Sequence, residues 1–226
     1  MSGFDSNSLN YGLLFSLTME EATGTAITGD AAKPHHTTSL THSPAWVQLP
    51  SGVWVMDFNS AHPDYLQCSA ATTADLDFTS GAFSVSMWIK QHASVASTRY
   101  LINRGDGAGA HGWCITTYNN YLYWGTPGSV EIRSTGAFSI NVWSLIIVTK
   151  SGTLGKSFVN GIELSYILQG ALNPTTDTEK LLIGIFNDEA TGAWDGEIWN
   201  PRIWNRALSP EEIYYMFQRE RWMFRV

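Results

Sequence analysis

Residues 194–213 read Trp-Asp-Gly-Glu-Ile-Trp-Asn-Pro-Arg-Ile-Trp-Asn-Arg-Ala-Leu-Ser-Pro-Glu-Glu-Ile. The end of this stretch is a capping box, because the Ser209 hydroxyl can accept the third helical amide while the Glu212 carboxylate reaches back to the cap. Pro210 fits the first helical position, where no amide proton is needed. We therefore expect a helix that begins at Pro210. Apolar residues continue at helical spacing at Ile213, Met216 and Phe217.

Upstream of this helix, turn-rich polar stretches recur about every ten residues, which is the rhythm of a sandwich or a barrel. Phe83–Lys90 alternates apolar and polar residues, apart from Trp88 on the polar side, as a strand with one buried face does. Asn160-Gly161 predicts a tight hairpin turn, and Tyr118–Asn120 separates two further strand-like runs. Together these patterns predict an all-β protein.

Composition limits the classes of protein that remain. The chain has 226 residues, of which 13% are aromatic and only 15% are charged, so it is not disordered. Its apolar runs are far shorter than the ~20 residues of a membrane span. The formal net charge of −7 makes nucleic acid an unsuitable partner. The length fits one domain with a polar, weakly charged surface.

The two cysteines, Cys68 and Cys114, lie in strand-like segments without a CxxC pair. A disulfide between them stays open, and buried free thiols are favoured. The first ten residues contain no basic segment followed by a cleavage site, so we expect no signal peptide.

The ordered set of motifs resembles the concanavalin A-like lectin/glucanase superfamily, in its laminin-G-like or pentraxin-like branch. The resemblance runs from about Leu13 to Phe217, and the closing run Arg202–Ile213 is its most specific part. The other matching segments are Leu13–Glu20 with Gly24-Thr25, Met56–Phe58, Asp64–Leu66, Phe83–Lys90, Gly112-Trp113, Val142-Trp143, Phe158–Gly161, Leu182–Gly184 and Trp194–Ile198.

The resemblance implies a two-sheet antiparallel jelly-roll sandwich with adjacent first and last strands and one short C-terminal helix. It assigns Trp88, Trp113, Trp143 and Trp204 to the core. We divide the chain into an N-terminal arm (1–10), the jelly-roll domain (11–217) and an aromatic and basic C-terminal tail (218–226).

Enzymes of the superfamily cleave glycans with two glutamates in a Glu-x-Asp-x-x-Glu arrangement on one strand, and that arrangement is absent here. The closest acidic groupings, Asp188-Glu189 and Asp195-x-Glu197, differ in spacing and fall near predicted turns. A glycan-cleaving enzyme would need a close pair among Glu131, Glu163, Asp188, Glu189, Asp195 and Glu197. We therefore expect a protein that is not an enzyme and that requires no cofactor.

Many relatives hold a structural calcium ion between the loop after the first strand and the last strand. Glu20, Asp30 and Asp195 are the candidate ligands here, because calcium prefers carboxylate and carbonyl oxygens. The acids that relatives often carry near the last strand are replaced by Trp199-Asn200, so a simple loop-capping role for these acids stays open.

Lectin sites combine a flat aromatic ring with amide and carboxylate groups. The segment Tyr118–Trp124 offers both, and we select Tyr118, Asn120, Tyr121, Trp124 and Trp194 as candidate carbohydrate-binding residues. A core role for these aromatics is the alternative. The segment Asn103–Asp106, His111 and the loop Phe186–Trp194 are further polar candidates at a rim.

After Phe217 the chain continues with Trp222, Met223 and Phe224 among arginines, the residue types that interface centres concentrate. We select Arg219, Arg221, Trp222 and Phe224 as partner-docking residues. A solvated helix end is the alternative. This ending resembles the closings of laminin-G-like proteins encoded among the particle genes of tailed bacteriophages and related viruses.

The leading hypothesis is therefore a non-catalytic protein of a virion, made in the host cytoplasm, that decorates a capsid or belongs to a tail or fibre. We expect it to form a homo-oligomer, to contact other particle proteins and to adhere to cell-surface glycans, but not to bind membranes. The alternatives are a free carbohydrate-binding lectin and, less favoured, a glycan-cleaving enzyme.

Overall fold

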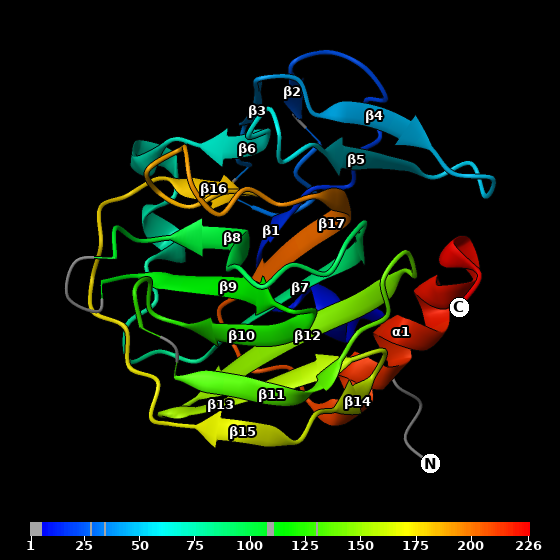
Figure 1. Ribbon diagram of the computed structural model, residues 1–226. Helices are drawn as coiled ribbons and strands as arrows, with labels where there is room; N and C mark the ends of the chain where they lie inside the picture. Colours follow the sequence, from blue (N-terminus) through cyan, green and yellow to red (C-terminus); the bar gives the residue numbers. More distant parts are fainter. Residues whose placement is uncertain (1–5, 28, 34, 108–110, 130) are drawn as a thin grey trace.

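The computed structural model describes residues 6–27, 29–33, 35–107, 111–129 and 131–226, and it consists of two stacked sheets with one α-helix (Figure 1). The eight-stranded sheet has the order β14-β13-β12-β7-β17-β5-β4, with β1 also paired to β17. Its strands are β1 (Leu13–Ser16), β4 (Ala45–Gln48), β5 (Trp54–Phe58), β7 (Phe83–Gln91), β12 (Ser144–Ser151), β13 (Leu154–Val159), β14 (Ile162–Glu163) and β17 (Gly196–Trp204).

The nine-stranded sheet has the order β15-β11-β10-β9-β8-β16-β6-β3-β2. Its strands are β2 (Ala26–Ile27), β3 (Thr38–Thr41), β6 (Tyr65–Cys68), β8 (Arg99–Arg104), β9 (Trp113–Tyr118), β10 (Tyr121–Gly125), β11 (Ile132–Ala137), β15 (Tyr166–Gln169) and β16 (Leu181–Ile183). Short 3-10 turns are η1 (Ser6–Asn10), η2 (Ala70–Thr72) and η3 (Ala74–Leu76).

Every pairing between these strands is antiparallel, which confirms the predicted two-sheet sandwich. β1 lies beside β17, so the first and last strands are neighbours as expected. The predicted turn at Asn160-Gly161 joins β13 to β14, and both residues have positive φ values, 53° and 83°. Such values suit the two central positions of a type I′ hairpin.

The main core lies between the sheets and follows from the alternation of the strands. On β7, Phe83, Val85, Met87 and Ile89 point inward, as the alternation of Phe83–Lys90 predicts. Trp113 and Trp124 reach the same core from the nine-stranded sheet. Apolar surface removed from water in this layer stabilises the fold by roughly 25 cal/mol per Å².

A second core lies on the other face of the eight-stranded sheet, under the helix α1 (Pro210–Phe224). The Ser209–Glu212 capping box is present in both directions, because Ser209 accepts from the Glu212 amide and the Glu212 side chain accepts from the Ser209 amide. Trp88, on the polar side of the β7 alternation, is fully buried there. Trp143 and Trp204 belong to this second core too, so the assignment of these tryptophans to the core is confirmed.

The expected division of the chain at Phe217 is wrong, because α1 continues unbroken through Phe224. Phe224 is only 6% exposed, and its ring contacts Trp88, Trp143 and Trp199 at centroid distances of 4.3, 4.7 and 5.4 Å. The C-terminal segment is therefore an integral part of the domain.

At the other end of the chain, η1 packs against the strand β17 and the residues after it. The Trp204 indole donates a hydrogen bond of 2.7 Å to the Leu9 carbonyl, and Arg206 donates to the carbonyls of Ser8 and Tyr11. The first half of the predicted N-terminal arm, residues 1–5, lies outside the described residues.

Cys68 and Cys114 are both buried free thiols, which confirms the favoured alternative. Within the described part of the chain, α1 is not long and apolar enough to cross a membrane, and neither is any other helix.

Candidate functional site

Three tyrosines of the β9–β10 hairpin lie on the outer side of the nine-stranded sheet. Tyr121 pairs with Tyr118 and Tyr123 pairs with Thr116, which places all four residues on one face of the hairpin. The alternate residues Ile115, Leu122 and Trp124 point into the core. The three tyrosines are partly exposed, so their rings remain accessible to a ligand.

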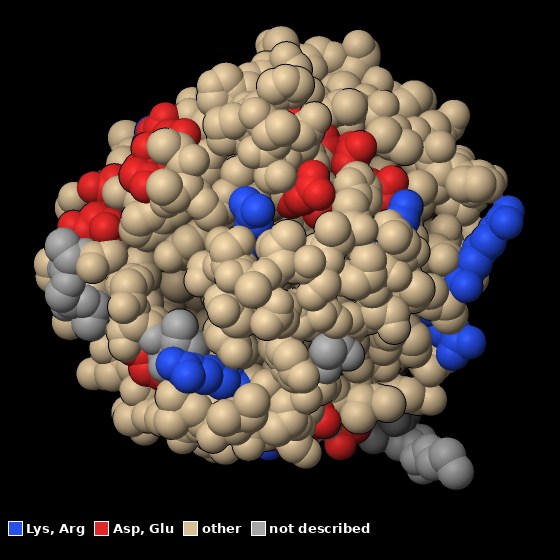
Figure 2. Space-filling view, in the orientation of Figure 1, with Lys and Arg blue, Asp and Glu red and all other residues tan. Residues whose placement is uncertain are grey.

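The rings of Tyr118 and Tyr123 are nearly parallel, with centroids 6.2 Å apart and planes that differ by 5°. Arg133 of β11 pairs with Tyr123, and its Cζ atom lies 5.8 Å from that ring. We call Tyr118, Tyr121, Tyr123 and Arg133 the tyrosine face. Figure 2 shows that the surface over β9 and β10 carries few charged side chains. A flat, weakly charged aromatic surface is suited to stacking on the apolar side of a pyranose ring.

The turn between β9 and β10 holds the tyrosines in register. Asn119 and Asn120 have φ values of 49° and 55°, a conformation that asparagine tolerates better than most residues. The Asn120 amide donates to the Phe138 carbonyl at 2.6 Å and its Oδ1 accepts from the Ser94 hydroxyl at 3.0 Å. The Asn120 side chain therefore fixes the turn.

Two of the predicted carbohydrate-binding residues cannot stack on a ligand. Trp124 is 1% exposed and Trp194 is fully buried, because both belong to the core between the sheets. The selection of these two tryptophans is wrong. Strand alternation explains Trp124, since it lies one position from Tyr123 and therefore on the opposite face. The same alternation identifies Tyr123, which the sequence reasoning missed.

A loop from Phe186 to Thr191 crosses the outer face beside the tyrosine face. The Phe186 ring packs on the Tyr100 ring at 4.8 Å. The Glu189 carboxylate accepts a 2.5 Å hydrogen bond from the Tyr65 hydroxyl and forms an ion pair with Lys180. The hydrogen bonds from Lys180 and Tyr65 hold the pKa of Glu189 below its usual value. These contacts anchor the loop over β6 and β16.

Beyond this loop, the same sheet carries a pocket of about 550 Å³ whose mainly apolar wall includes several polar side chains. The lining residues are Thr37, Ser39, Gln67, Ser69, Ala70, Thr72, Glu179 and Lys180. Hydroxyl, amide and charged groups of this kind can donate to and accept from the hydroxyls of a sugar. We call this the Lys180 pocket.

The structure does not bring the predicted calcium ligands Glu20, Asp30 and Asp195 together. Among the described residues, the group of acids and histidines with converging ligand atoms contains none of them. Asp195 accepts from the Ser60 amide, and Glu20 is exposed. The predicted ligand set is wrong.

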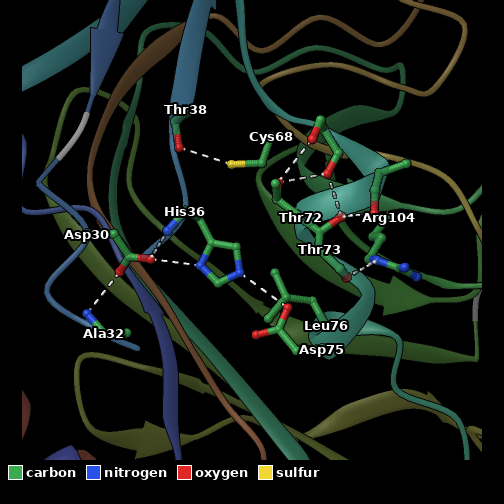
Figure 3. Close-up of polar contacts among 12 residues, drawn as sticks. Asp30, Ala32, His36, Thr38, Cys68, Thr72, Thr73, Asp75, Leu76 and Arg104 are labelled. Carbon is green, nitrogen blue, oxygen red and sulfur yellow. Dashed lines mark hydrogen bonds and ion pairs between the residues drawn. The ribbon is translucent and has the colours of Figure 1, made fainter. Parts of the chain in front are cut away.

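Asp30 instead belongs to a buried network around His36 (Figure 3). Its carboxylate accepts from the backbone amides of Ser16, Ala32 and His36, and lies 2.7 Å from His36 Nδ1. His36 Nε2 lies 3.2 Å from Asp75 of η3. Burial lowers the pKa of His36, but the bonds to Asp30 and Asp75 outweigh burial and raise it. The network ties the loop after β2 to η3.

The residues whose ligand atoms do converge are Asp106, His111 and Asp177, all within 4.8 Å of one another. Asp177 accepts from the Asp106 amide at 3.2 Å and from the Glu179 amide at 2.6 Å, so its position is fixed. Two carboxylates and an imidazole can hold a divalent cation. Asp106 and His111 are among the polar rim residues selected from the sequence. No local sequence pattern predicts that Asp177, 71 positions after Asp106, lies beside them.

The acids considered for glycan cleavage are engaged in local contacts. Glu131 accepts from Thr126, Glu163 pairs with Lys156, and Asp188 accepts from Thr191. Glu197 is 7% exposed and lies 2.6 Å from the Lys90 ammonium. Its cross-strand neighbour is Asp57, an acid that the sequence reasoning missed. Burial and the charges of Glu197 and Asp195 raise the pKa of Asp57, while His92 and Lys90 oppose the increase.

The predicted docking residues divide into one buried and three exposed side chains. Phe224 fills the second core, so its selection as a docking residue is wrong. Trp222 is 66% exposed. Arg219 donates to the Tyr215 hydroxyl at 3.3 Å, and the Arg221 guanidinium lies 5.5 Å from the Phe217 ring.

A family model of the concanavalin A-like lectin/glucanases superfamily matches residues 67–214, which is more than half of the chain. The chain therefore belongs to this superfamily. No curated protein is a significant match to it.

Solved structures of clostridial toxin binding domains share the fold. The binding domain of Paraclostridial Mosquitocidal Protein 1 superposes with a TM-score of 0.74 at 18% identity, covering 92% of this chain and 52% of that one. A structure described with the dependence of botulinum neurotoxin type C cell entry on two ganglioside molecules superposes with a TM-score of 0.70 at 16% identity. The match covers 95% of this chain and 53% of that one.

The binding domain of botulinum neurotoxin DC in complex with SialylT gives a TM-score of 0.67 at 14% identity, covering 93% of this chain and 52% of that one. The chain thus spans about half the length of these proteins. Identities this low show a common fold.

Proposed function

We propose that this member of the concanavalin A-like lectin/glucanases superfamily binds glycans through the tyrosine face and does not cleave them. The observation that carries the proposal is the pair of nearly parallel, partly exposed rings of Tyr118 and Tyr123 on the outer side of the sheet. Arg133 beside them can donate hydrogen bonds to ligand hydroxyls or to a carboxylate.

The Lys180 pocket supports the same proposal, because it offers hydrogen-bonding groups on the same sheet. Aromatic stacking gives a sugar site its affinity for the ring, and polar groups give it selectivity among hydroxyl patterns. Tyr118 and Tyr121 remain predicted binding residues, joined now by Tyr123 and Arg133, while Asn120 holds the turn that positions them.

The structural neighbours are consistent with adhesion to a cell surface. They include binding domains of toxins, one described with gangliosides, one with SialylT and one with rat synaptotagmin II. We propose cell-surface glycans as the ligand class for this chain. A role without catalysis agrees with the engagement of its acids, since Glu197 is held by Lys90 rather than free to donate a proton.

The test is binding to an array of neutral and acidic oligosaccharides, followed by titration calorimetry with the strongest ligand. Replacing Tyr123 with alanine should weaken binding about tenfold, the loss of roughly 1.4 kcal/mol. Tyr123→Phe keeps the ring and should bind nearly as the wild type does. Tyr214→Ala removes an exposed aromatic of α1 and is the matched control. Equal binding by Tyr123→Ala and Tyr214→Ala would refute the site.

We further propose that the chain acts on a virus particle, as capsid decoration or as a tail or fibre component. The resemblance of its C-terminal segment to phage particle proteins and the exposure of Trp222 support this location. Mass spectrometry of purified particles should find the chain in fixed proportion to the major capsid or tail protein. Its absence from the particles would leave the free lectin as the better description.

A further inference from the structure

The exposed end of α1 combines one large aromatic side chain with three cations. Trp222 is 66% exposed, and Arg219, Arg221 and Arg225 lie within one turn of it. None of these arginines takes part in the ion pairs found among the described residues. We call these four residues the Trp222 knob.

A hollow of about 360 Å³ lies beside η2 and η3. Three alanines of η2 and η3 supply apolar wall, and Asp77 and Asp177 supply carboxylates. Its lining is Ala70, Ala71, Ala74, Asp77, Arg104, Thr176, Asp177 and Thr178. We call this the acidic hollow.

The carboxylates of the hollow are held by the surrounding chain. Asp77 accepts from Arg104 at 2.8 Å and from the Asp177 amide at 2.9 Å. Arg104 is 1% exposed, so its charge is covered by this pair. A carboxylate oxygen of Asp106 lies within 4.8 Å of one of Asp177, which adds negative charge beside the hollow. An aromatic side chain flanked by arginines fits an apolar hollow with an acidic rim.

The knob and the hollow lie at opposite ends of the domain. Figure 1 places α1 on the right and the short turns beside β6 and β8 on the left, and Figure 2 shows basic groups at the right edge and acidic groups at the upper left. Because the two surfaces face away from each other, one chain cannot join its own knob to its own hollow.

We infer that the chain associates head to tail with a second copy of itself, the Trp222 knob of one copy seated in the acidic hollow of the next. The charge complementarity of the two ends and the apolar wall of the hollow carry this inference. A head-to-tail contact leaves one knob and one hollow free in each pair, so association continues into a ring or a filament.

The test is sedimentation velocity of the full chain at rising concentration, at low salt and with a chelator so that no added cation occupies the hollow. The wild type should sediment as species larger than a monomer, and added salt should disperse them. Trp222→Ala removes the knob, and Ala71→Arg fills the hollow from an exposed position. Each change should weaken association about tenfold or more.

Mixing the two variants distinguishes a head-to-tail contact from a symmetric one. Trp222→Ala keeps its hollow and Ala71→Arg keeps its knob, so an equimolar mixture should form dimers and nothing larger. Tyr214→Ala, which removes another exposed aromatic of α1, should associate as the wild type does.

A wild type that stays monomeric at every concentration overturns the inference, and so does a mixture that fails to form dimers. A third contradicting result is a monomeric chain whose tryptophan fluorescence shifts with anionic phosphatidylserine vesicles in the wild type but not in Trp222→Ala, because Trp222 would then contact a lipid surface. None of these results bears on glycan binding by the tyrosine face.

Discussion

Replacing Phe224 with alanine tests whether the C-terminal segment belongs to the core. The ring is 6% exposed and lies among the indoles of Trp88, Trp143 and Trp199 at 4.3 to 5.4 Å. Truncating a buried phenylalanine removes its transfer free energy and leaves a cavity, at a cost of about 3–5 kcal/mol. We expect the same loss here.

For a domain of this size, each kcal/mol shifts the melting temperature by about 2–4 °C, so the expected fall is about 6–20 °C. Thermal unfolding followed by circular dichroism and by calorimetry measures it, and agreement of the two enthalpies checks that unfolding is two-state.

The neighbouring residue Trp222 provides the control. Because it is 66% exposed, Trp222→Ala should change stability by no more than about 0.5 kcal/mol, measured where the chain is monomeric. A cost under about 1 kcal/mol for Phe224→Ala, or equal melting temperatures for the two variants, would show that the C-terminal segment is not part of the core.

The pKa of His36 is raised and that of Asp30 is lowered, so the pair stabilises the fold fully between their ordinary pKa values of 3.8 and 6.5. The contribution of His36 to stability is lost as pH rises through its raised pKa. The contribution of Asp30 is lost as pH falls through its lowered pKa. His36→Gln should therefore lower the melting temperature more near pH 6 than in alkaline buffer, and an equal effect at both contradicts the network. Ser209→Ala removes the helix cap and should cost about 1 kcal/mol in urea unfolding, whereas no change would mean that the cap contributes nothing. Calcium should raise the melting temperature of the wild type but not of Asp177→Asn, and a similar rise in both would place the ion elsewhere.

The sequence predicts the features of this fold that depend on local chemistry. The capping box at Ser209 defines the helix start, and Asn160-Gly161 defines a hairpin, because each is specified by residues a few positions apart. The end of α1 was not predictable in this way. Phe224 belongs to the helix because Trp88 and Trp199 of distant strands, with Trp143 just before β12, bury its ring, whereas the sequence pattern around it resembles an exposed tail.

The same distinction applies to the candidate site. Alternation along β10 is enough to place Tyr121 and Tyr123 on one face and Trp124 on the other, so the hairpin is not a single aromatic surface. By contrast, the convergence of Asp106 with Asp177 depends on the approach of two loops, which only tertiary structure determines.

Mapping the bound ligand by NMR is the sharpest test of glycan binding by the tyrosine face. The chain is titrated with the strongest ligand from the oligosaccharide array while its amide and aromatic resonances are followed. We expect the largest chemical-shift changes at Tyr118, Tyr121, Tyr123 and Arg133, with smaller changes around the Lys180 pocket. Chemical-shift changes confined to α1 or to the loop around Asp106, with the tyrosine ring resonances unchanged, would show that the glycan binds elsewhere.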